Sequence, residues 1–450
     1  MVEVNSHLAP ERAALAGDGA TDERALMLTI VDNAGVTRVR SVPARRAKHV
    51  ARVGAGLAPS YVVFAVDDQI TSTPGFDTPS GNMRLVPDLA SGVALSQPSG
   101  WIWAPADQHD EAMHVMPTCQ RSTLKRLVAS ASTMEVSFRM AFELEFTLCH
   151  PDGRAIHEGP SHGLRALLEV EEFAASLFDA LSEQGVKVEQ LHPEHGAGQF
   201  ELSVEAGSPI EAADRHVLLR LTIGRVARQH GLRASFAPAV FPGAVGNGCH
   251  LHFSTWRDGQ NLQAGGDGPE GMSGPGMALA AGVLNHLPDF LAIYAPSVVS
   301  YERLQPGRFA GAFTCWGREN REAALRFIRG STTDSTNIEL KVVDGASNPY
   351  LVASAVVAAA LDGLSNDLRL PPPLQDDPAI IEGERSHPGL RRLPADLGES
   401  IAAFERSALT RATLGDSLYE AFLAVRRLEW QTFGDVELSE ALDRHRWQYG

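Results

Sequence analysis

Acidic side chains alternate with apolar ones at Glu143 and Glu145, within the segment 141–146. Three further segments repeat this alternation of metal-capable and apolar side chains: residues 199–203, 249–254 and 338–342. Because side chains alternate across a β-strand, each segment predicts a strand with one apolar face and one polar face. Carboxylates that converge on a partly buried surface repel one another unless a cation or a proton compensates them. The pattern therefore predicts an enzyme that uses a divalent metal ion.

The composition is that of a soluble globular protein. The chain has 450 residues, of which 44% are hydrophobic and 21% charged, values that suit two or three domains. Its formal net charge is −16. We therefore expect no nucleic-acid partner, because phosphate binding requires a basic surface.

The cysteine spacing and the N-terminus indicate a cytoplasmic protein. Four cysteines are widely separated and form neither a zinc-ribbon nor a redox motif: Cys119, Cys149, Cys249 and Cys315. We expect four reduced thiols. The N-terminus has no basic and apolar signal-peptide regions, and the longest apolar run, residues 351–361, is too short to cross a bilayer. No membrane partner is expected.

The N-terminal quarter of the chain is rich in strand signals. Residues 25–31 and 36–40, separated by a short polar turn, predict a β-hairpin. Further strands are predicted at residues 61–66, 93–95 and 101–103. Residues 1–22 are polar and rich in alanine and glycine, and we expect a flexible arm there. A small β-rich domain over residues 23–115 is the simplest interpretation.

Helix and strand signals alternate through residues 116–450, which we interpret as one larger domain. Its first helix is expected to be capped by Ser122 or Thr123. The clearest helix start is Ser208, which is followed by proline in the first turn and by an acid that complements the helix dipole. Gly231 predicts the end of that helix.

Five ordered segments of the sequence resemble glutamine synthetase, over nearly the whole length of the chain. The segments are residues 142–146, 192–201, 246–252, 321–326 and 339–351. Each segment alone is a weak signal, whereas their order along one chain is specific. The resemblance implies an α+β fold. It comprises a small N-terminal β-grasp-like domain, residues 23–115, and a catalytic domain, residues 116–450, whose antiparallel sheet is flanked by helices and binds ATP, glutamate and metal.

The resemblance also implies two divalent-metal sites and an oligomer. One Mg²⁺ or Mn²⁺ would be held by Glu145, Glu194 and Glu201, and a second by Glu143, His250 and Glu339. Five carboxylates and one imidazole form a hard, oxygen-dominated set that suits these ions better than Zn²⁺ or copper. Relatives of this kind assemble as homododecamers of two stacked hexameric rings, with active sites formed between subunits.

The remaining site residues are also implied by the resemblance. His252 and Ser254 match nucleotide contacts, and Arg321 and Arg326 match arginines that stabilise the phosphates. A guanidinium's fixed charge and forked donors suit that task. Arg303, Gly246 and Lys341 match positions that bind the glutamate substrate, although Lys341 stands where the family has an arginine. Arg321, Glu339 and Asp68 are the expected catalytic residues.

The sequence departs from ammonia-using relatives at Phe309. They carry a glutamate there, which helps to form the ammonium site. An aromatic ring cannot act as a counter-charge, but it can line a path for an alkyl chain. Asp68 matches the aspartate that polarises the incoming amine and that a neighbouring subunit lends in this family. The combination of Phe309 and Asp68 resembles that of the γ-glutamylpolyamine synthetases, a branch of the same family.

We therefore expect ATP-dependent γ-glutamylation of a primary amine through γ-glutamyl phosphate. The expected amine is a polyamine, such as putrescine, cadaverine, spermidine or spermine, in polyamine catabolism or detoxification. An alkylammonium has a pKa near roughly 10.4, so activity is expected to rise toward alkaline pH. Three alternatives stay open: a ligase for ethanolamine or another monoamine, an ammonia-using glutamine synthetase, and a catalytically silent regulatory homologue.

Overall fold

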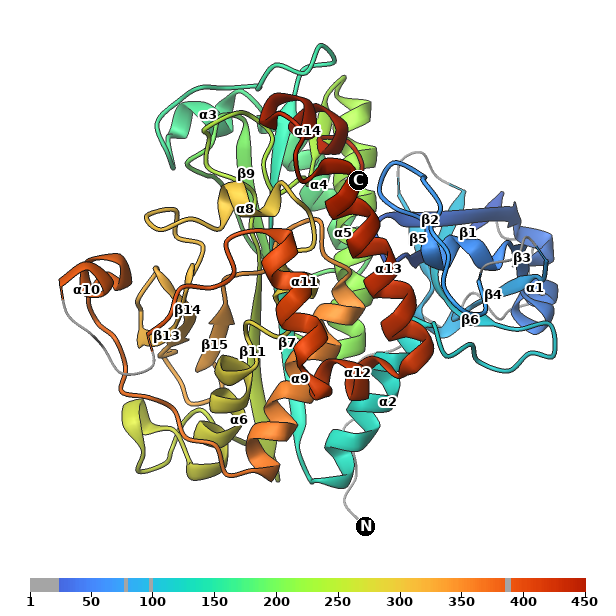
Figure 1. Cartoon of the computed structure of the whole chain (residues 1–450). Coiled ribbons are helices and arrows are strands. Elements are labelled where there is room, and N and C mark those ends of the chain that lie inside the picture. The colour runs from blue at the N-terminus through green and yellow to red at the C-terminus, as the bar shows by residue number, and fades with distance from the viewer. Residues whose placement is uncertain (1–23, 77–79, 97–99, 385–389) are drawn as a thin grey trace.

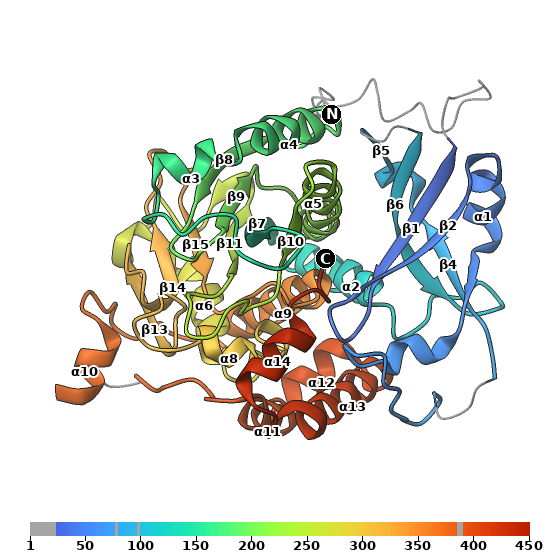
Figure 2. The same ribbon diagram turned by 90° about the horizontal axis from the view of Figure 1, so that it is seen from above.

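The chain folds around two β-sheets that lie on opposite sides of a layer of helices (Figures 1 and 2). The computed structural model describes residues 24–76, 80–96, 100–384 and 390–450. The arm expected at residues 1–22 lies outside the described residues.

The smaller sheet contains the predicted hairpin and lies in the N-terminal part of the chain. Its strand order is β2-β1-β6-β4-β3, and β5 pairs with β6. The strands are β1 (Ala25–Val31), β2 (Thr37–Pro43), β3 (Ala55–Leu57), β4 (Met83–Pro87), β5 (Val93–Leu95) and β6 (Trp101–His109), and α1 (Ala47–Val53) packs beside them. The hairpin closes through Asp32, whose carboxylate accepts hydrogen bonds from the backbone of Ala34 and Val36. The strand predicted at residues 61–66 is wrong, because Pro59–Val63 forms a 3₁₀ helix.

The larger sheet contains the four alternating segments. Its order is β13-β14-β15-β11-β7-β9-β8, with β10 paired to β7 and β12 paired to β11. The strands are β7 (Ser137–Cys149), β8 (Val188–Pro193), β9 (Gln199–Val204), β10 (Arg233–Ser235), β11 (Cys249–Arg257), β12 (Gln260–Asn261), β13 (Phe313–Arg318), β14 (Ala323–Ile328) and β15 (Asn337–Leu340). The pairs are antiparallel as expected, except that β13 and β14 are parallel.

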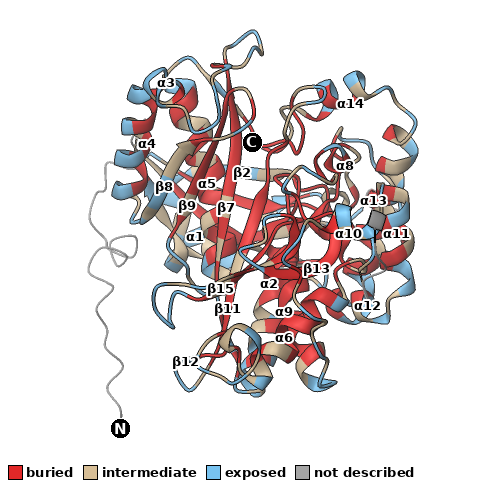
Figure 3. Ribbon diagram, turned by 90° about the vertical axis from the view of Figure 1, so that its left-hand side faces the viewer, coloured by how far each residue is buried: buried red, intermediate tan, exposed pale blue. Residues whose placement is uncertain are grey.

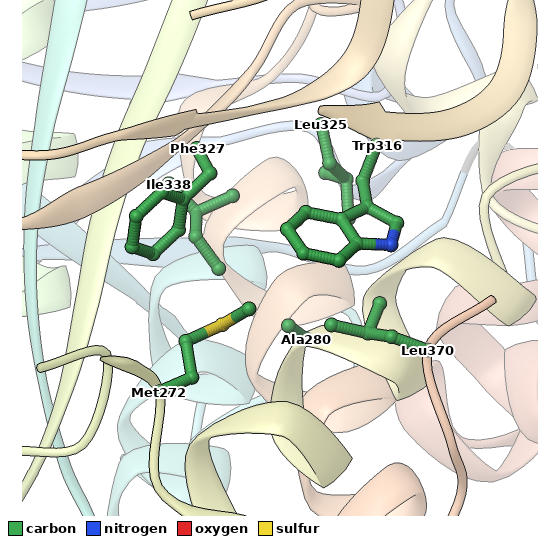
Figure 4. A pocket seen from close by; sticks show the side chains of 7 residues that line it. All are labelled: Met272, Ala280, Trp316, Leu325, Phe327, Ile338 and Leu370. Atoms are coloured by element: carbon green, nitrogen blue, oxygen red, sulfur yellow. The ribbon is translucent and has the colours of Figure 1, made fainter. Parts of the chain in front are cut away.

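Helices cover the apolar face of the larger sheet. The main ones are α2 (Gln120–Thr133), α5 (Pro209–Gln229), α6 (Gly274–Asn285) and α9 (Pro349–Ser365). Helix α9 is buried along almost its whole length, as its mostly red colour in Figure 3 shows. Met272 and Ala280 of the α6 region pack against Trp316, Leu325 and Phe327 of the sheet (Figure 4). The cavity left between them is only about 10 Å³ and wholly apolar, so it suits neither a ligand nor an ordered water.

The other helices surround this core. They are α3 (Leu164–Leu168), α4 (Glu171–Glu183), α7 (Leu291–Tyr294), α8 (Ser300–Arg303), α10 (Pro378–Glu384), α11 (Leu397–Arg406), α12 (Ala408–Leu414), α13 (Asp416–Phe433) and α14 (Leu438–His445). Across the described parts of the chain, no helix is both long and apolar enough to cross a membrane. All four cysteine thiols are free, as the sequence predicts, and the structure buries them.

Of the two predicted helix starts, that of α5 is confirmed and that of α2 is wrong. Helix α5 begins after Ser208 with a complete capping box to Glu211, and Gly231 follows its end with a φ of +68°, as predicted. Helix α2 begins at Gln120 rather than after Ser122 or Thr123. The earlier start places Arg121 in a buried ion pair with Asp214 of α5, at 2.8 Å.

Candidate active site: an acidic face on the larger sheet

Strand register brings the separated glutamates together on the polar face of the larger sheet. His250 of β11 lies opposite Glu143 of β7, and Glu145 lies opposite Glu201 of β9. Glu339 of β15 is the register partner of His252. Directly opposed residues have Cβ atoms about 4.5–5.5 Å apart, so these four glutamates lie close together. Glu194 lies in the loop after β8 and is the fifth carboxylate of this surface, which we call the acidic face.

One group of ligand-type atoms converges on His250. Its Nδ1 atom lies 3.3 Å from Glu143 Oε2 and 3.2 Å from Glu339 Oε1. Its Nε2 atom accepts a hydrogen bond from the Arg303 guanidinium at 3.0 Å. This contact leaves Nδ1, with the ring proton, directed at the two carboxylates.

Glu145 clusters with Glu201 and His250, and Glu194 clusters with Glu201 and His192, so the predicted set of Glu145, Glu194 and Glu201 is divided between two groups. Oε2 of Glu145 accepts hydrogen bonds from the Gln199 amide, at 2.6 Å, and from the Gly248 backbone, at 2.8 Å. The His192 ring lies between the other two acids. Its Nε2 is 3.1 Å from Glu201 and its Nδ1 is 3.4 Å from Glu194.

The pKa values of the carboxylates are shifted in opposite directions. Burial, together with the charges of Glu143 and Glu145, raises the pKa of Glu201 far above its ordinary value. Glu339 is only 1% exposed, yet the ammonium of Lys341 and the nearby histidines outweigh burial and lower its pKa. Glu143 also has a pKa well below the usual range, because hydrogen bonds to His250 and His252 overcome burial.

These residues fit a pair of divalent cations. Ligand-type atoms of Glu143, His250 and Glu339, and those of Glu145, Glu201 and His250, all lie within 4.8 Å of one another inside each group. Burial beside Glu143 and Glu145 raises the pKa of Glu201 and so favours its protonated form. A cation supplies the missing compensation, and the oxygen-rich donors suit Mg²⁺ or Mn²⁺.

Basic side chains border the acidic face on the side of β14 and β15. Arg326 donates to Glu339 at 3.1 Å and to Glu319 at 2.6 Å. Lys341 is buried and donates to Glu339 at 2.9 Å. Arg321 lies apart from these contacts, exposed in the turn before β14, where its guanidinium is accessible to an anion.

The two expected nucleotide contacts occupy the same strand. Successive side chains of β11 that point to one face include His250, His252 and Ser254. Nε2 of His252 lies 3.2 Å from Glu143, and the charge of Glu143 raises the pKa of His252 to about 9 against the effect of burial. The Ser254 hydroxyl accepts a hydrogen bond from the Trp256 indole at 2.8 Å.

Two glycines make room for this arrangement. A Cβ on Gly246 would stand 2.0 Å from the carbonyl oxygen of Pro238. A Cβ on Gly248 would stand 2.5 Å from His250 Nε2 and 2.8 Å from Glu145 Oε1. No side chain fits there without displacing the groups that form the site.

The Gly248→Ala variant is expected to lose about 100-fold in turnover, because a small displacement of catalytic groups is worth that much. A matched control is Gly224→Ala, since a Cβ on Gly224 meets no atom within 4 Å and the residue lies inside helix α5. The control should be neutral or slightly stabilising. Steady-state kinetics and thermal melting distinguish these outcomes, and a fully active Gly248→Ala enzyme would contradict the described packing.

Phe309 lies on a loop at the edge of the acidic face. Its side chain is 48% exposed and its φ is +54°, a conformation that aromatic residues rarely adopt. The Glu322 carboxylate fixes this loop by accepting hydrogen bonds from the backbone of Phe309, at 2.8 Å, and of Gly307, at 3.3 Å. The Phe309 ring contacts His195 at a centroid distance of 6.0 Å. Glu322 was not among the predicted site residues.

Asp68 does not join the acidic face of its own chain. It lies in the N-terminal lobe, with a φ of +65°, and its ion-pair partner is Arg38 at 2.7 Å. Helices α2, α5 and α9 separate that lobe from the larger sheet (Figure 2). The side chain is 66% exposed, so it is accessible to another molecule.

Three histidines around Glu194 were missed as site residues by sequence analysis. His192 carries a usable signal, because it lies two residues before Glu194 and opposite Glu201. His195 and His162 carry none, since loop residues show no periodicity and His162 is distant in sequence. Gln199 was also missed, although it alternates with Glu201 on β9.

Comparisons with known proteins identify the class. A family model described as the catalytic domain of glutamine synthetase matches residues 117–443. The chain is 43% identical over 434 residues to gamma-glutamylpolyamine synthetase GlnA3 of Streptomyces coelicolor, covering 94% of this chain and 93% of that one. It is 31% identical over 425 residues to a glutamine synthetase of Rhizobium leguminosarum, covering 90% and 93%.

Solved structures agree with this assignment. A crystal structure of a novel glutamine synthase homolog superimposes with a TM-score of 0.85 at 30% identity, covering 96% of this chain and 100% of the other. GmaS without ligand superimposes with a TM-score of 0.81 at 30% identity, covering 93% and 96%. The chain belongs to the glutamine synthetase family. It is an ATP-dependent ligase with the α+β fold of that family, and the family uses ATP and divalent metal ions.

Proposed function

We propose that this enzyme uses ATP to γ-glutamylate a primary amine through γ-glutamyl phosphate, and that its acceptor is a polyamine such as putrescine, cadaverine, spermidine or spermine. Phe309 is the observation that carries the choice of acceptor. Its half-exposed ring stands at the edge of the acidic face, where a carboxylate would serve ammonium. The 43% identity to a gamma-glutamylpolyamine synthetase supports the same choice.

The polar face offers a role for each group of side chains. We assign one cation to Glu145, Glu194 and Glu201 and another to Glu143, His250 and Glu339. When bound, such cations neutralise the charge of a phosphoryl group in transfer. The guanidinium groups of Arg321 and Arg326 add fixed positive charge beside them, and His252 and Ser254 lie along β11 where we place the nucleotide.

We place the glutamate substrate between Gly246, Arg303 and Lys341. Arg303 is buried, and its Nη2 atom donates to the Lys341 carbonyl at 2.8 Å, which fixes the guanidinium beside His250. Lys341 adds a second buried cation. Two fixed positive charges suit the carboxylates of glutamate.

We propose that Asp68 of a neighbouring subunit accepts the proton of the amine. Within one chain the helix layer separates Asp68 from the acidic face, whereas its carboxylate, paired with Arg38 but 66% exposed, is accessible to the site of another copy. This arrangement requires an oligomer, and we propose the homododecamer of two hexameric rings. An Asp68→Asn enzyme mixed with a Glu339→Gln enzyme should regain activity if the two residues act in different subunits.

The proposed reaction is tested by measuring the phosphate released from ATP when glutamate and one amine at a time are supplied. We expect the polyamines to give the highest kcat/KM and ammonia and ethanolamine to give low values. Activity should also rise from pH 6 to 9, as more of the amine loses its proton. Fastest turnover with ammonia or ethanolamine would contradict the proposed acceptor, and no turnover with any amine would contradict the proposed reaction.

The Phe309→Glu variant should improve the use of ammonia at least about tenfold relative to putrescine, because one well-placed charge interaction is worth about 1.4 kcal/mol or more. The matched control is Phe178→Glu, which places the same change on a helix-α4 side chain that is 42% exposed. The kcat/KM ratio for the two acceptors is the measurement. An unchanged ratio in Phe309→Glu would show that this position does not select the amine.

A further inference from the structure

We propose that His162, His195 and Glu194 form an additional metal site at the mouth of the acidic face, and that it takes a borderline transition ion such as Zn²⁺ in preference to Mg²⁺. Ligand-type atoms of the three residues lie within 4.8 Å of one another. His195 Nδ1 is 3.1 Å from Glu194 Oε2, and His162 Nε2 is 3.8 Å from Glu194 Oε1. Zinc sites in proteins are built from such imidazole and carboxylate donors.

A third imidazole stands beside these two. The His192 ring lies 5.2 Å from the His162 ring, and the His162 and His195 rings are 5.6 Å apart. Nδ1 of His192 is 3.4 Å from Glu194 Oε1, and it is buried without a hydrogen-bond partner of good geometry. His192 therefore borders the site through Glu194, while its own ligand-type atoms cluster with Glu194 and Glu201.

Both loops that present these ligands are held by backbone hydrogen bonds. His162 lies in a tight turn with a φ of +54°, closed by a hydrogen bond from the Gly163 N–H to the Pro160 carbonyl at 3.0 Å. The loop of Glu194 and His195 is closed by the Glu194 N–H, which donates to the Gln199 carbonyl at 2.8 Å. Ligands held in this way lose little freedom when an ion binds.

The donor chemistry distinguishes this site from the acidic face. The metal ligands expected on the acidic face are five carboxylates and one imidazole, whereas the site of His162, His195 and Glu194 offers one carboxylate and two imidazoles. Imidazole favours Zn²⁺, Ni²⁺ and Cu²⁺, and carboxylates favour Mg²⁺ and Mn²⁺. A carboxylate has two oxygens. Glu194 can therefore contact an ion held by His162 and His195 and, at the same time, an ion on the acidic face.

Zinc binding to the full-length protein, with the acidic face saturated by Mg²⁺, tests this site. We expect equilibrium dialysis to show one Zn²⁺ per chain, and we expect the variant His162→Gln/His195→Gln to bind it at least about tenfold more weakly. The matched control is His114→Gln, since His114 is 80% exposed and lies in the N-terminal part of the chain. Equal zinc affinity and stoichiometry in the wild-type protein and the double variant would overturn the proposal.

X-ray absorption of the zinc-loaded wild-type protein decides the question without a variant. We expect scattering from at least two imidazole rings, at Zn–N distances of about 2.0–2.1 Å. A first shell with no more than one imidazole would fit the acidic face, where His250 is the expected imidazole ligand, and would overturn the proposal, even if the double variant did not fold.

Discussion

The Glu339→Gln variant is expected to lose at least about 100-fold in turnover and about 3–5 kcal/mol in the free energy of unfolding. The carboxylate is 1% exposed and lies against Arg326, Lys341 and His250. Removing its charge leaves a buried lysine uncompensated, and breaking a buried pair costs about this much. Turnover should fall at least as far, because replacing a residue that only hydrogen-bonds to a metal ligand already lowers metal affinity or activity about 10–100-fold.

Glu319 provides the matched control for Glu339. It contacts the same arginine, at 2.6 Å, but is 45% exposed. A Glu319→Gln enzyme should lose less than about 1 kcal/mol, as exposed ion pairs do. Chemical unfolding without metal and initial-rate kinetics give both quantities. Similar values for the two variants would contradict the role of Glu339 as the charge that organises this side of the site.

The Glu201→Gln variant should change stability and activity in opposite directions. Burial and the charges of Glu143 and Glu145 raise the pKa of Glu201 in the folded protein above its value in the unfolded chain. At neutral pH the folded state therefore binds more protons, and stability due to this group is present at acidic pH and lost as the pH rises. Glutamine keeps the neutral form, so the metal-free variant should melt at a higher temperature at pH 9.

The same substitution removes a proposed metal ligand, so turnover should fall at least about 100-fold and Mg²⁺ should no longer raise the melting temperature. Melting from pH 5 to 9, with and without Mg²⁺, checks both effects. Glu205 is the control, because it lies just beyond β9, is 48% exposed and pairs with Lys187 at 3.0 Å. A Glu201→Gln protein that melts like Glu205→Gln under every condition would contradict the described crowding of carboxylates.

Much of the larger sheet could be predicted because its strands carry their own signal. The alternation at residues 141–146 and 249–254 reports directly which side chains share a face, and β7 and β11 follow it. Helix α5 could be predicted because its capping box is local. The order of the strands could not be derived from these patterns, since strand pairing joins residues that are far apart in sequence.

Two elements were mispredicted because tertiary contacts outweigh local preference. Residues 61–66 are apolar, and a short apolar run does not distinguish a strand from a helix turn. In the structure Val62 and Val63 pack against Ala421 of α13, which places them away from the sheet. Helix α2 starts early because the buried Gln120 bonds to Asn33 at 2.8 Å, a contact with no local signature.

The acidic residues on strands could be found because a strand fixes the direction of its side chains. Glu194 lies in a loop and was named only through the family resemblance, and the loop histidines were not found. His162 and His195 meet only through the folding of two loops onto one carboxylate. Asp68 shows a second limit of sequence patterns, because we propose that it acts in the active site of a different subunit. A sequence pattern cannot report a distance between chains.

Anomalous diffraction from crystals soaked with Mn²⁺ and a non-hydrolysable ATP analogue tests the central claim most directly. We expect two manganese peaks on the polar face, one between Glu145, Glu194 and Glu201 and the other between Glu143, His250 and Glu339. Bound analogue with no manganese between these residues would contradict the assignment of the acidic face as a metal-dependent active site.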